Sequence, residues 1–358
     1  MKILCNLLGV TLASLLAGAL GCSTERHMPT SARTVDGADT LISPSTELLT
    51  QPSAIALHAD GVAYVADFGH GRVIALGVAG IPLLIGRKGR GPGELQAPAA
   101  IRVDSDTIRV VDPGNSRIEL FTRQGRHIRS YTNPAVTMTA RFDIAPNGRL
   151  AVASHGLGSD SLVTIVNQQG DEIARVGSPI APITRGWDLA AMKRDVAARR
   201  VPDVLLNGVL PRFGASGHLW IVFLAAAKVE ERDSAGRKLL EVHISVPALN
   251  RIKSAFFDRN LKEPRQFAFY PLQYFADAVV VGEDLWLLLN LPDGEPREVI
   301  VVGRDGSLRQ HLLFAGVKDA WSMAVDVERR RVYFASPASA SVVSVTLPSQ
   351  EVSRLESP

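Results

Sequence analysis

The chain has 358 residues, of which 46% are apolar and 21% charged, so it can supply a packed core. Its length would fit two average domains, although repeat architectures often reach this size as one domain. The formal net charge of +3 falls to +2 if the N-terminal segment carrying Lys2 is removed, which gives no reason to expect a nucleic-acid partner.

The first residues predict an export signal. Lys2 precedes the apolar run Ile3–Leu20, which ends at Gly21 and Cys22. A positive start, an apolar stretch and small residues before a polar segment are typical of a secretory signal peptide. The end of the run also resembles a bacterial lipobox, with Ala19 where Leu is usual. We therefore expect a lipoprotein-type signal peptide over residues 1–21 and a lipid on Cys22. Ordinary cleavage nearby and an uncleaved anchor are the alternatives.

The cysteines support the lipid interpretation. The chain has two, and Cys5 lies inside the apolar run, so the mature protein would keep Cys22 alone. This excludes a disulfide framework or a cysteine-based metal site. The segment Ser23–Ser45 is rich in Ser, Thr, Asp and Pro. Such a composition predicts a flexible tether over residues 22–49, between the membrane and a folded body.

Two segments after the tether repeat one unit. Pro52–Leu57 matches Pro98–Val103 at a separation of 46 residues, and Val62–Asp67 then matches Thr107–Asp112. In both copies an Arg follows the Asp by five residues, across a turn that contains Gly. Short aliphatic and β-branched runs separated by Gly, Asp, Asn and Pro predict antiparallel strands. Each copy therefore predicts four strands.

The unit recurs, with decay, towards the C-terminus. Four later copies keep the order of strands and turns, and their clearest strands are Arg149–Ser154, His218–Phe223, Asp284–Leu289 and Arg331–Ala335. A four-stranded antiparallel unit recurring about every 40–50 residues is typical of a propeller blade, which buries its faces only against its neighbours. The sequence predicts an all-β fold, a six-bladed β-propeller over residues 50–358.

Two long connections interrupt the repeats, near residues 183–203 and 247–270. Trp187–Arg200 and Leu249–Leu261 carry apolar residues at spacings of three and four, so they predict two short helical insertions. We expect these helices to cap one face of the propeller. The sequence leaves open how the ring closes, because either Glu351–Leu355 or Thr40–Leu49 could complete the sixth blade.

The glycine-rich run Gly86–Leu95, followed by Pro98, Val110–Asp112 and Asn115–Ile118, resembles NHL-like six-bladed β-propeller proteins, especially their bacterial secreted and lipoprotein members. The resemblance is strongest over Thr50–Tyr131. It implies the fold and leaves the function open. Some members of that superfamily bind proteins or carbohydrates without catalysis, whereas others are lyases or lactonases that hold a metal in the central channel.

Several motifs have a structural interpretation that we prefer. Gly86–Gly93 is glycine-rich and basic, but it leads into a strand rather than a helix, so we expect a connection between blades and no phosphate site. Asp67 and Asp112 occupy equivalent places in adjacent repeats, which favours turn capping over catalysis. Trp220 and Trp286 occupy equivalent strands and are expected in the blade core.

A metal site is the main alternative to a purely structural interpretation of the turns. His70 and His155 follow the second strands of their repeats and could hold a metal together with Asp67 or Asp160. Exposed turn histidines are the alternative that we favour. The sequence contains no nucleophile elbow and no catalytic constellation that can be read from it. We therefore assign no catalytic residue and expect no cofactor.

The first helical insertion carries the candidate binding residues. Trp187 lies outside the repeats, and Arg194, Arg199 and Arg200 make a basic face that could contact an anionic glycan or a lipid headgroup, or could simply be solvated. We predict a monomeric, non-catalytic binding module for a protein or glycan, in the cell envelope and in contact with the membrane only through its N-terminal lipid. The alternative is a metal-dependent lyase or lactonase acting in the channel.

Overall fold

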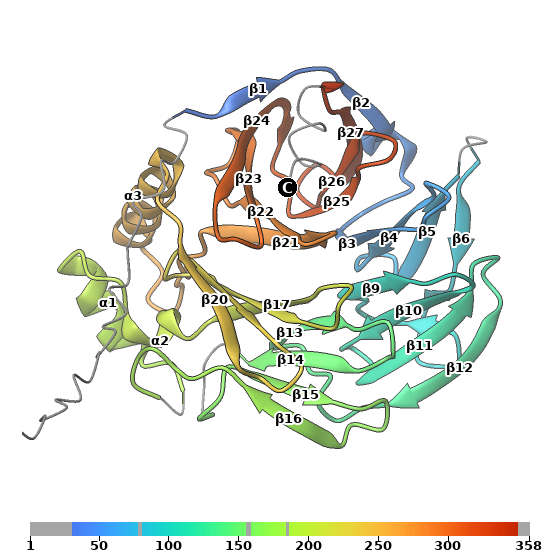
Figure 1. Cartoon of the computed structure of the whole chain (residues 1–358), viewed down its shortest axis with the longest axis horizontal. Helices are drawn as coiled ribbons and strands as arrows, with labels where there is room; N and C mark the ends of the chain where they lie inside the picture. The colour runs from blue at the N-terminus through green and yellow to red at the C-terminus, as the bar shows by residue number, and fades with distance from the viewer. Residues whose placement is uncertain (1–30, 78–80, 155–158, 184–185, 350–358) are drawn as a thin grey trace, which may run out of the picture.

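Six antiparallel sheets arranged around a ring make up the protein, and they confirm the predicted six-bladed β-propeller (Figure 1). The computed structural model describes residues 31–77, 81–154, 159–183 and 186–349. Each blade is built from consecutive strands, the first of them innermost. The first three blades comprise β3 Pro52–Leu57, β4 Ala63–Asp67, β5 Arg72–Leu76 and β6 Leu83–Ile85; β9 Ala100–Val103, β10 Thr107–Asp112, β11 Arg117–Thr122 and β12 His127–Thr132; β13 Ala140–Ile144, β14 Leu150–Ser154, β15 Val163–Val166 and β16 Glu172–Val176.

The other three blades follow the same order. They comprise β17 Val209–Phe213, β18 Leu219–Phe223, β19 Lys228–Arg232 and β20 Lys238–His243; β21 Phe275–Val281, β22 Asp284–Leu289, β23 Pro296–Val302 and β24 Leu308–Lys318; β25 Ser322–Asp326, β26 Arg331–Ser336 and β27 Ser341–Thr346. A two-stranded pair, β7 Arg87–Lys88 and β8 Glu94–Leu95, lies in the connection between the first two blades. The inner strands β3, β9, β13, β17, β21 and β25 contact one another in a closed ring.

A glycine recurs in the hairpin that precedes the outer strand of four blades, and it has a conformational role. In the hairpin between the third and fourth strands, Gly125, Gly170, Gly236 and Gly306 have φ values of 88°, 94°, 82° and 79°. A positive φ is readily adopted by glycine and disfavoured for residues with a Cβ. These glycines therefore mark where blades two to five turn into their outer strands.

The N-terminal segment closes the ring, which corrects the predicted extent of the tether. β2 (Ala38–Ile42) pairs antiparallel with β27 and supplies the outer strand of the sixth blade, while β1 (Arg33–Val35) pairs parallel with β24 (Figure 1). Ile42 is buried, with a relative exposure of 1%. Burial of this apolar side chain between the first and last blades binds the segment to the body. The other candidate for closure, Glu351–Leu355, lies outside the described residues.

Helices lie together at one edge of the ring (Figure 1). The first insertion forms α1 (Leu189–Ala197) and α2 (Asp203–Leu206), and the second forms α3 (Pro247–Lys262). α1 begins two residues later than predicted because the Asp188 side chain caps it, accepting a hydrogen bond from the Ala191 N–H at 2.9 Å. α1 packs against α3. No helix in the described part of the chain is long and apolar enough to cross a membrane.

Buried side chains fill the spaces between the blades and fix α3 to the fifth blade. Trp220 and Trp286 are among the largest fully buried side chains, as the sequence predicts. Arg251 of α3 pairs with Glu298 of β23, and the other carboxylate oxygen of Glu298 lies 2.6 Å from His311 Nε2. Burial opposes ionisation of Glu298, but hydrogen bonds from His311 and Arg251 outweigh it and lower the pKa of this carboxyl.

Candidate functional site

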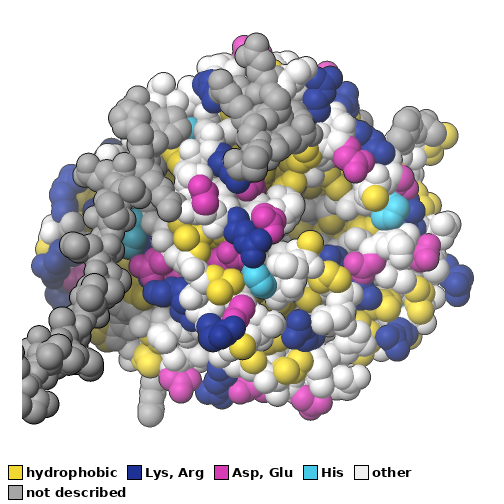
Figure 2. Space-filling model, in the orientation of Figure 1, with side chains coloured by type: hydrophobic (Ala, Val, Ile, Leu, Met, Phe, Trp, Pro, Cys, Tyr) yellow, Lys and Arg dark blue, Asp and Glu magenta, His cyan; other side chains and the backbone are white. Residues whose placement is uncertain are grey.

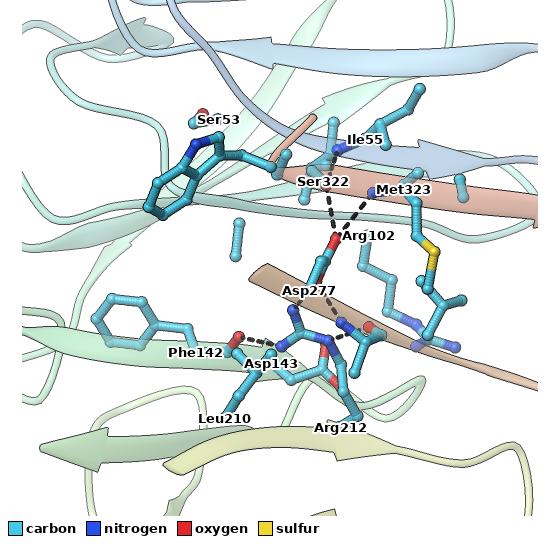
Figure 3. Close-up of a pocket in the computed structure, with 18 of the residues that line it drawn as sticks. Ser53, Ile55, Arg102, Phe142, Asp143, Leu210, Arg212, Asp277, Ser322 and Met323 are labelled. Atoms are coloured by element: carbon cyan, nitrogen blue, oxygen red, sulfur yellow. Dashed lines mark hydrogen bonds and ion pairs between the residues drawn. The ribbon is translucent and has the colours of Figure 1, made fainter. Parts of the chain in front are cut away.

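A channel runs through the centre of the propeller, and all six inner strands line it. Its cavity has a volume of about 710 Å³. Pockets of about 300–1,000 Å³ suit small ligands or one or two units of a larger one. Figure 3 shows Arg212 and Asp277 near the middle of the lining, with Ser322 and Met323 on one side and Phe142 on the other. We describe this channel as the candidate site.

The insertions and the inner strands define the two ends of the channel. The connections that carry the helices lead into the first residues of β17 and β21. Trp321 immediately precedes β25, and it lines one groove together with residues of α3. We call this end, with α1, α2, α3 and Trp321, the helix-bearing face. The Trp321 side chain is 44% exposed, and the backbone N–H of Trp321 donates to the Ala335 carbonyl at 2.9 Å. The backbone of blade six thus holds an aromatic ring at the mouth of the channel.

One ion pair crosses the channel wall. Arg212 of β17 lies 2.5 Å from Asp277 Oδ1 and also donates to the carbonyl of Ala278 at 2.6 Å (Figure 3). The other oxygen of Asp277 accepts hydrogen bonds from the Ser322 hydroxyl at 2.8 Å and from the Met323 N–H at 3.0 Å. Asp277 is buried, and the Ala278 N–H also donates to it, so three donors and the Arg212 guanidinium compensate its desolvation. The network ties blades four, five and six together.

A second carboxylate lies in the wall of the channel. Asp143 of β13 accepts a hydrogen bond from the Phe213 N–H at 2.6 Å. Desolvation raises the pKa of Asp143, while the positive charges of Arg212 and Arg102 oppose the shift. Arg102 is itself held by the Ile144 carbonyl and by Asp104 Oδ1, both at 3.1 Å. Both channel aspartates are therefore engaged by donors from the protein.

A groove extends from the mouth of the channel between α3 and the fifth blade. Its volume is about 440 Å³, and Trp321 lines both this groove and the channel. The groove also presents the Arg259 guanidinium, whose central carbon lies 3.6 Å from the centre of the Tyr270 ring, and the side chains of Asn290 and Asp293. Aromatic faces beside hydrogen-bonding groups characterise this part of the helix-bearing face.

Of the two candidate metal-binding histidines, His70 lies within the described part of the chain. His70 Nδ1 lies 2.8 Å from Asp67 Oδ2, and His155 lies outside the described residues. Asp160 pairs with Arg175 at 3.1 Å. Within residues 31–77, 81–154, 159–183 and 186–349, no group of three or more His, Cys, Asp or Glu side chains is placed to hold a metal ion. The metal site remains a prediction.

Trp187 and two of the three candidate arginines of the first insertion make contacts within the protein. Trp187 is 40% exposed and packs its ring edge-on against Phe269, with centroids 6.4 Å apart. Arg199 lies near the Phe257 ring, and Arg200 pairs with Asp195 at 2.7 Å. Arg194 is exposed on α1. Figure 2 shows basic and acidic side chains interspersed over the face that it displays.

The repeated aspartates serve the architecture. Asp67 accepts the Gln51 N–H at 2.9 Å, and Asp112 accepts the Gln96 and Ala97 N–H groups, both at 2.8 Å. Each carboxylate therefore fixes the chain that enters its blade. The arginines five residues later donate to backbone carbonyls of the chain that enters the blade. Arg72 donates to the Leu48 carbonyl at 2.7 Å, and Arg117 donates to the Arg90, Gly91 and Glu94 carbonyls at 2.6–2.8 Å.

The glycine-rich run is a connection between blades, as predicted. It links β6 to β9 and folds on itself, because Glu94 accepts the Gly91 N–H at 2.7 Å and pairs with Arg87 at 2.8 Å. Lys88 donates to the Gly69 carbonyl at 3.0 Å. Two of its basic side chains are thus engaged within the protein.

Sequence reasoning missed the residues that line the channel. Arg102, Arg141, Arg212 and Asp277 each interrupt an innermost strand that is otherwise mostly apolar or small. Comparison of the first strands of the copies could have singled them out. Trp321 was also not selected, although it directly precedes an inner strand. The predicted lipid-bearing residue, Cys22, lies outside the described residues.

Comparison with known proteins supports the fold. The chain matches no protein-family model and no curated protein sequence. Among solved structures, it is similar to virginiamycin B lyase from Staphylococcus aureus, with 13% identity, a TM-score of 0.53 and coverage of 87% of this chain and 99% of the lyase. It is also similar to a protein from Bacteroides fragilis that is named as an exported protein, with 10% identity, a TM-score of 0.54 and coverage of 88% and 99%. At these identities the likeness is one of fold alone.

Proposed function

We propose that this chain is a non-catalytic binding propeller of the cell envelope, anchored through Cys22, that takes a glycan at the helix-bearing face. The NHL-like resemblance and the lipobox-like end of the signal peptide support the envelope location, and the neighbour named as exported agrees with it. A protein partner is the alternative ligand. The rigid blades position the loops and helices that make the site.

One observation carries the glycan proposal: Trp321 lines both the channel and the groove. An exposed indole at the junction of two cavities can stack on the apolar face of a sugar ring, and the ring hydroxyls then need polar partners alongside. Arg259, Asn290 and Asp293 line the groove and supply them. An extended chain of sugars could lie in the groove and place one end in the channel.

A metal-dependent lyase or lactonase remains the rival function. The Staphylococcus aureus neighbour is a lyase, but its low identity carries the fold and no activity. Both oxygens of Asp277 already accept hydrogen bonds from the protein, so metal binding by Asp277 would compete with existing donors. Elemental analysis of the chain from Ser23, dialysed without added metal, separates the two functions. One tightly held ion per chain would favour the lyase or lactonase.

Affinity electrophoresis tests the proposed function. The chain from Ser23 keeps every described strand and helix, and it would be run through gels containing dextran, galactomannan, alginate or polygalacturonate. We expect at least one polysaccharide to retard the wild type, and Trp321→Ala to abolish the retardation. Leu239→Ala, which truncates a 49% exposed side chain on the outer strand β20, is the matched control. Unretarded wild type in every gel, or equal retardation of Trp321→Ala, would contradict the proposal.

A further inference from the structure

Arg141 is the one channel arginine that makes no hydrogen bond or ion pair with the described residues. It is the second residue of β13, near the end of the strand that faces the helix-bearing face, and it lines the same cavity as Trp321. Among the described residues, no hydrogen bond or ion pair reaches its guanidinium, and its Nε is buried without a partner. A buried donor without an acceptor costs about 1–3 kcal/mol. An arginine held in this way is a candidate ligand-binding group.

The neighbouring charges do not supply the missing acceptor. Asp277 lies close enough to Arg141 to favour its charge, but its two oxygens already accept from Arg212, Ser322 and two backbone N–H groups. Asp143 accepts the Phe213 N–H. Arg212 is a like charge, and its own donors are directed to Asp277 and to carbonyl oxygens.

The charge balance of the lumen points to an anion. Of the three arginines that line the cavity, Arg212 pairs with Asp277 and Arg102 pairs with Asp104, whereas no ion pair to Arg141 is present among the described residues. Burial and the like charge of Arg212 together lower the pKa of Arg141 to about 10, against the opposing effect of Asp277. The guanidinium therefore stays charged at neutral pH. A single negative charge on the ligand would balance the Arg141 guanidinium, whereas a dianion would leave an excess of negative charge near the aspartates.

We propose that the channel binds the carboxylate of an acidic sugar, which enters past Trp321 and pairs with the Arg141 guanidinium. This inference rests on the proposed glycan-binding function and names the chemical class of the sugar. A carboxylate is planar and carries one negative charge, and it can accept two parallel N–H donors from a guanidinium. The sugar ring behind it would lie between Arg141 and Trp321, both of which line the cavity.

Calorimetric titration with glucuronate and glucose tests the proposal, because the two sugars differ only in the carboxylate at C6. We expect glucuronate to bind the wild type at least tenfold more tightly than glucose. Arg141→Met should lower the affinity for glucuronate at least tenfold and leave the response to glucose unchanged. Arg126→Met, which removes an exposed positive charge in the β11–β12 hairpin, is the matched control and should bind as the wild type does.

Other outcomes distinguish the inference from the function on which it rests. Equal affinity of Arg141→Met and the wild type for glucuronate, or no binding of glucuronate to the wild type, would overturn the acidic-sugar assignment. If neutral polysaccharides still retarded the wild type and not Trp321→Ala, the proposed function would stand without it. Equal binding of sulfate and glucuronate at matched ionic strength would indicate a general anion site and would also overturn the assignment.

The melting temperature without ligand provides an independent test. Arg141→Met keeps most of the side-chain volume and removes a partly buried charge that is repelled by Arg212. We therefore expect the variant to melt at a higher temperature than the wild type, while its glucuronate binding falls. A lower melting temperature would identify Arg141 as a structural residue and contradict the proposal.

Discussion

Closure of the ring by the N-terminal segment can be tested with Ile42→Ala. Ile42 lies in β2 with a relative exposure of 1%, in a cluster with Ile55, Val65 and Val342 that joins the first and last blades. Truncation removes buried methyl and methylene groups and leaves a cavity, which costs about 2–5 kcal/mol for fully buried aliphatic residues. We expect the upper half of this range, because strands on both sides of the cavity are held in sheets and cannot easily collapse into it.

The neighbouring residue supplies the control for this experiment. Leu41 belongs to the same strand but is 38% exposed, so Leu41→Ala should change the free energy of unfolding by no more than about 0.5 kcal/mol. Urea titration at 25 °C of both variants and the wild type measures the difference, with an unchanged denaturant dependence as the condition for comparison. Equal stability of Ile42→Ala and Leu41→Ala would refute closure by β2.

Three further predictions concern the turns, pH dependence and the helical insertion. Asp112→Ala should lower the free energy of unfolding by about 2–4 kcal/mol, since it leaves two N–H groups without their acceptor. The free energy of unfolding of Asp106→Ala, a change at an exposed residue, should lie near that of the wild type in the same denaturation assay. Equal losses of stability in the two variants would contradict the capping role of Asp112. The lowered pKa of Glu298 means that its contribution to stability is present above its ordinary value of 4.5 and is lost as pH falls through the lower, folded-state pKa; melting curves of Glu298→Gln should therefore depend less on pH in that acid range than those of the wild type, and parallel profiles would oppose this. Asp188→Ala should cost about 1 kcal/mol by uncapping α1, measured by thermal melting, and an unchanged melting temperature would show that packing against α3 suffices.

The repeat pattern was sufficient to predict the fold because each blade is a local structure. The strand-forming runs, the turn residues and the glycine at the outer hairpin of blades two to five recur at short sequence separations, and hydrogen bonds within a blade join consecutive strands, apart from β1 and β2. The buried positions of Trp220 and Trp286 follow from their equivalent places in two copies. α1 and α3 were predicted to within a few residues, since their apolar spacing is also local, whereas the short α2 was not predicted.

The residues of the candidate site were harder to predict because they come from different blades. Trp187 and the arginines of the first insertion were chosen for their position outside the repeats, whereas the channel lining depends on which side chains six separate strands point inwards. Arg212 and Asp277 are 65 residues apart in the sequence and 2.5 Å apart in the fold. No local pattern records that pairing.

The sequence by itself determined the blades, their number, the two insertions and the export signal expected at the N-terminus, because each depends on residue order over short distances. The tertiary structure decided which terminal segment closes the ring and which charges meet in the channel. Both depend on contacts between residues remote in the chain, such as Ile42 with Val342 and Arg212 with Asp277. The contact of Arg212 with Asp277 joins two different blades, and the unpaired guanidinium of Arg141 is likewise a property of the assembled channel.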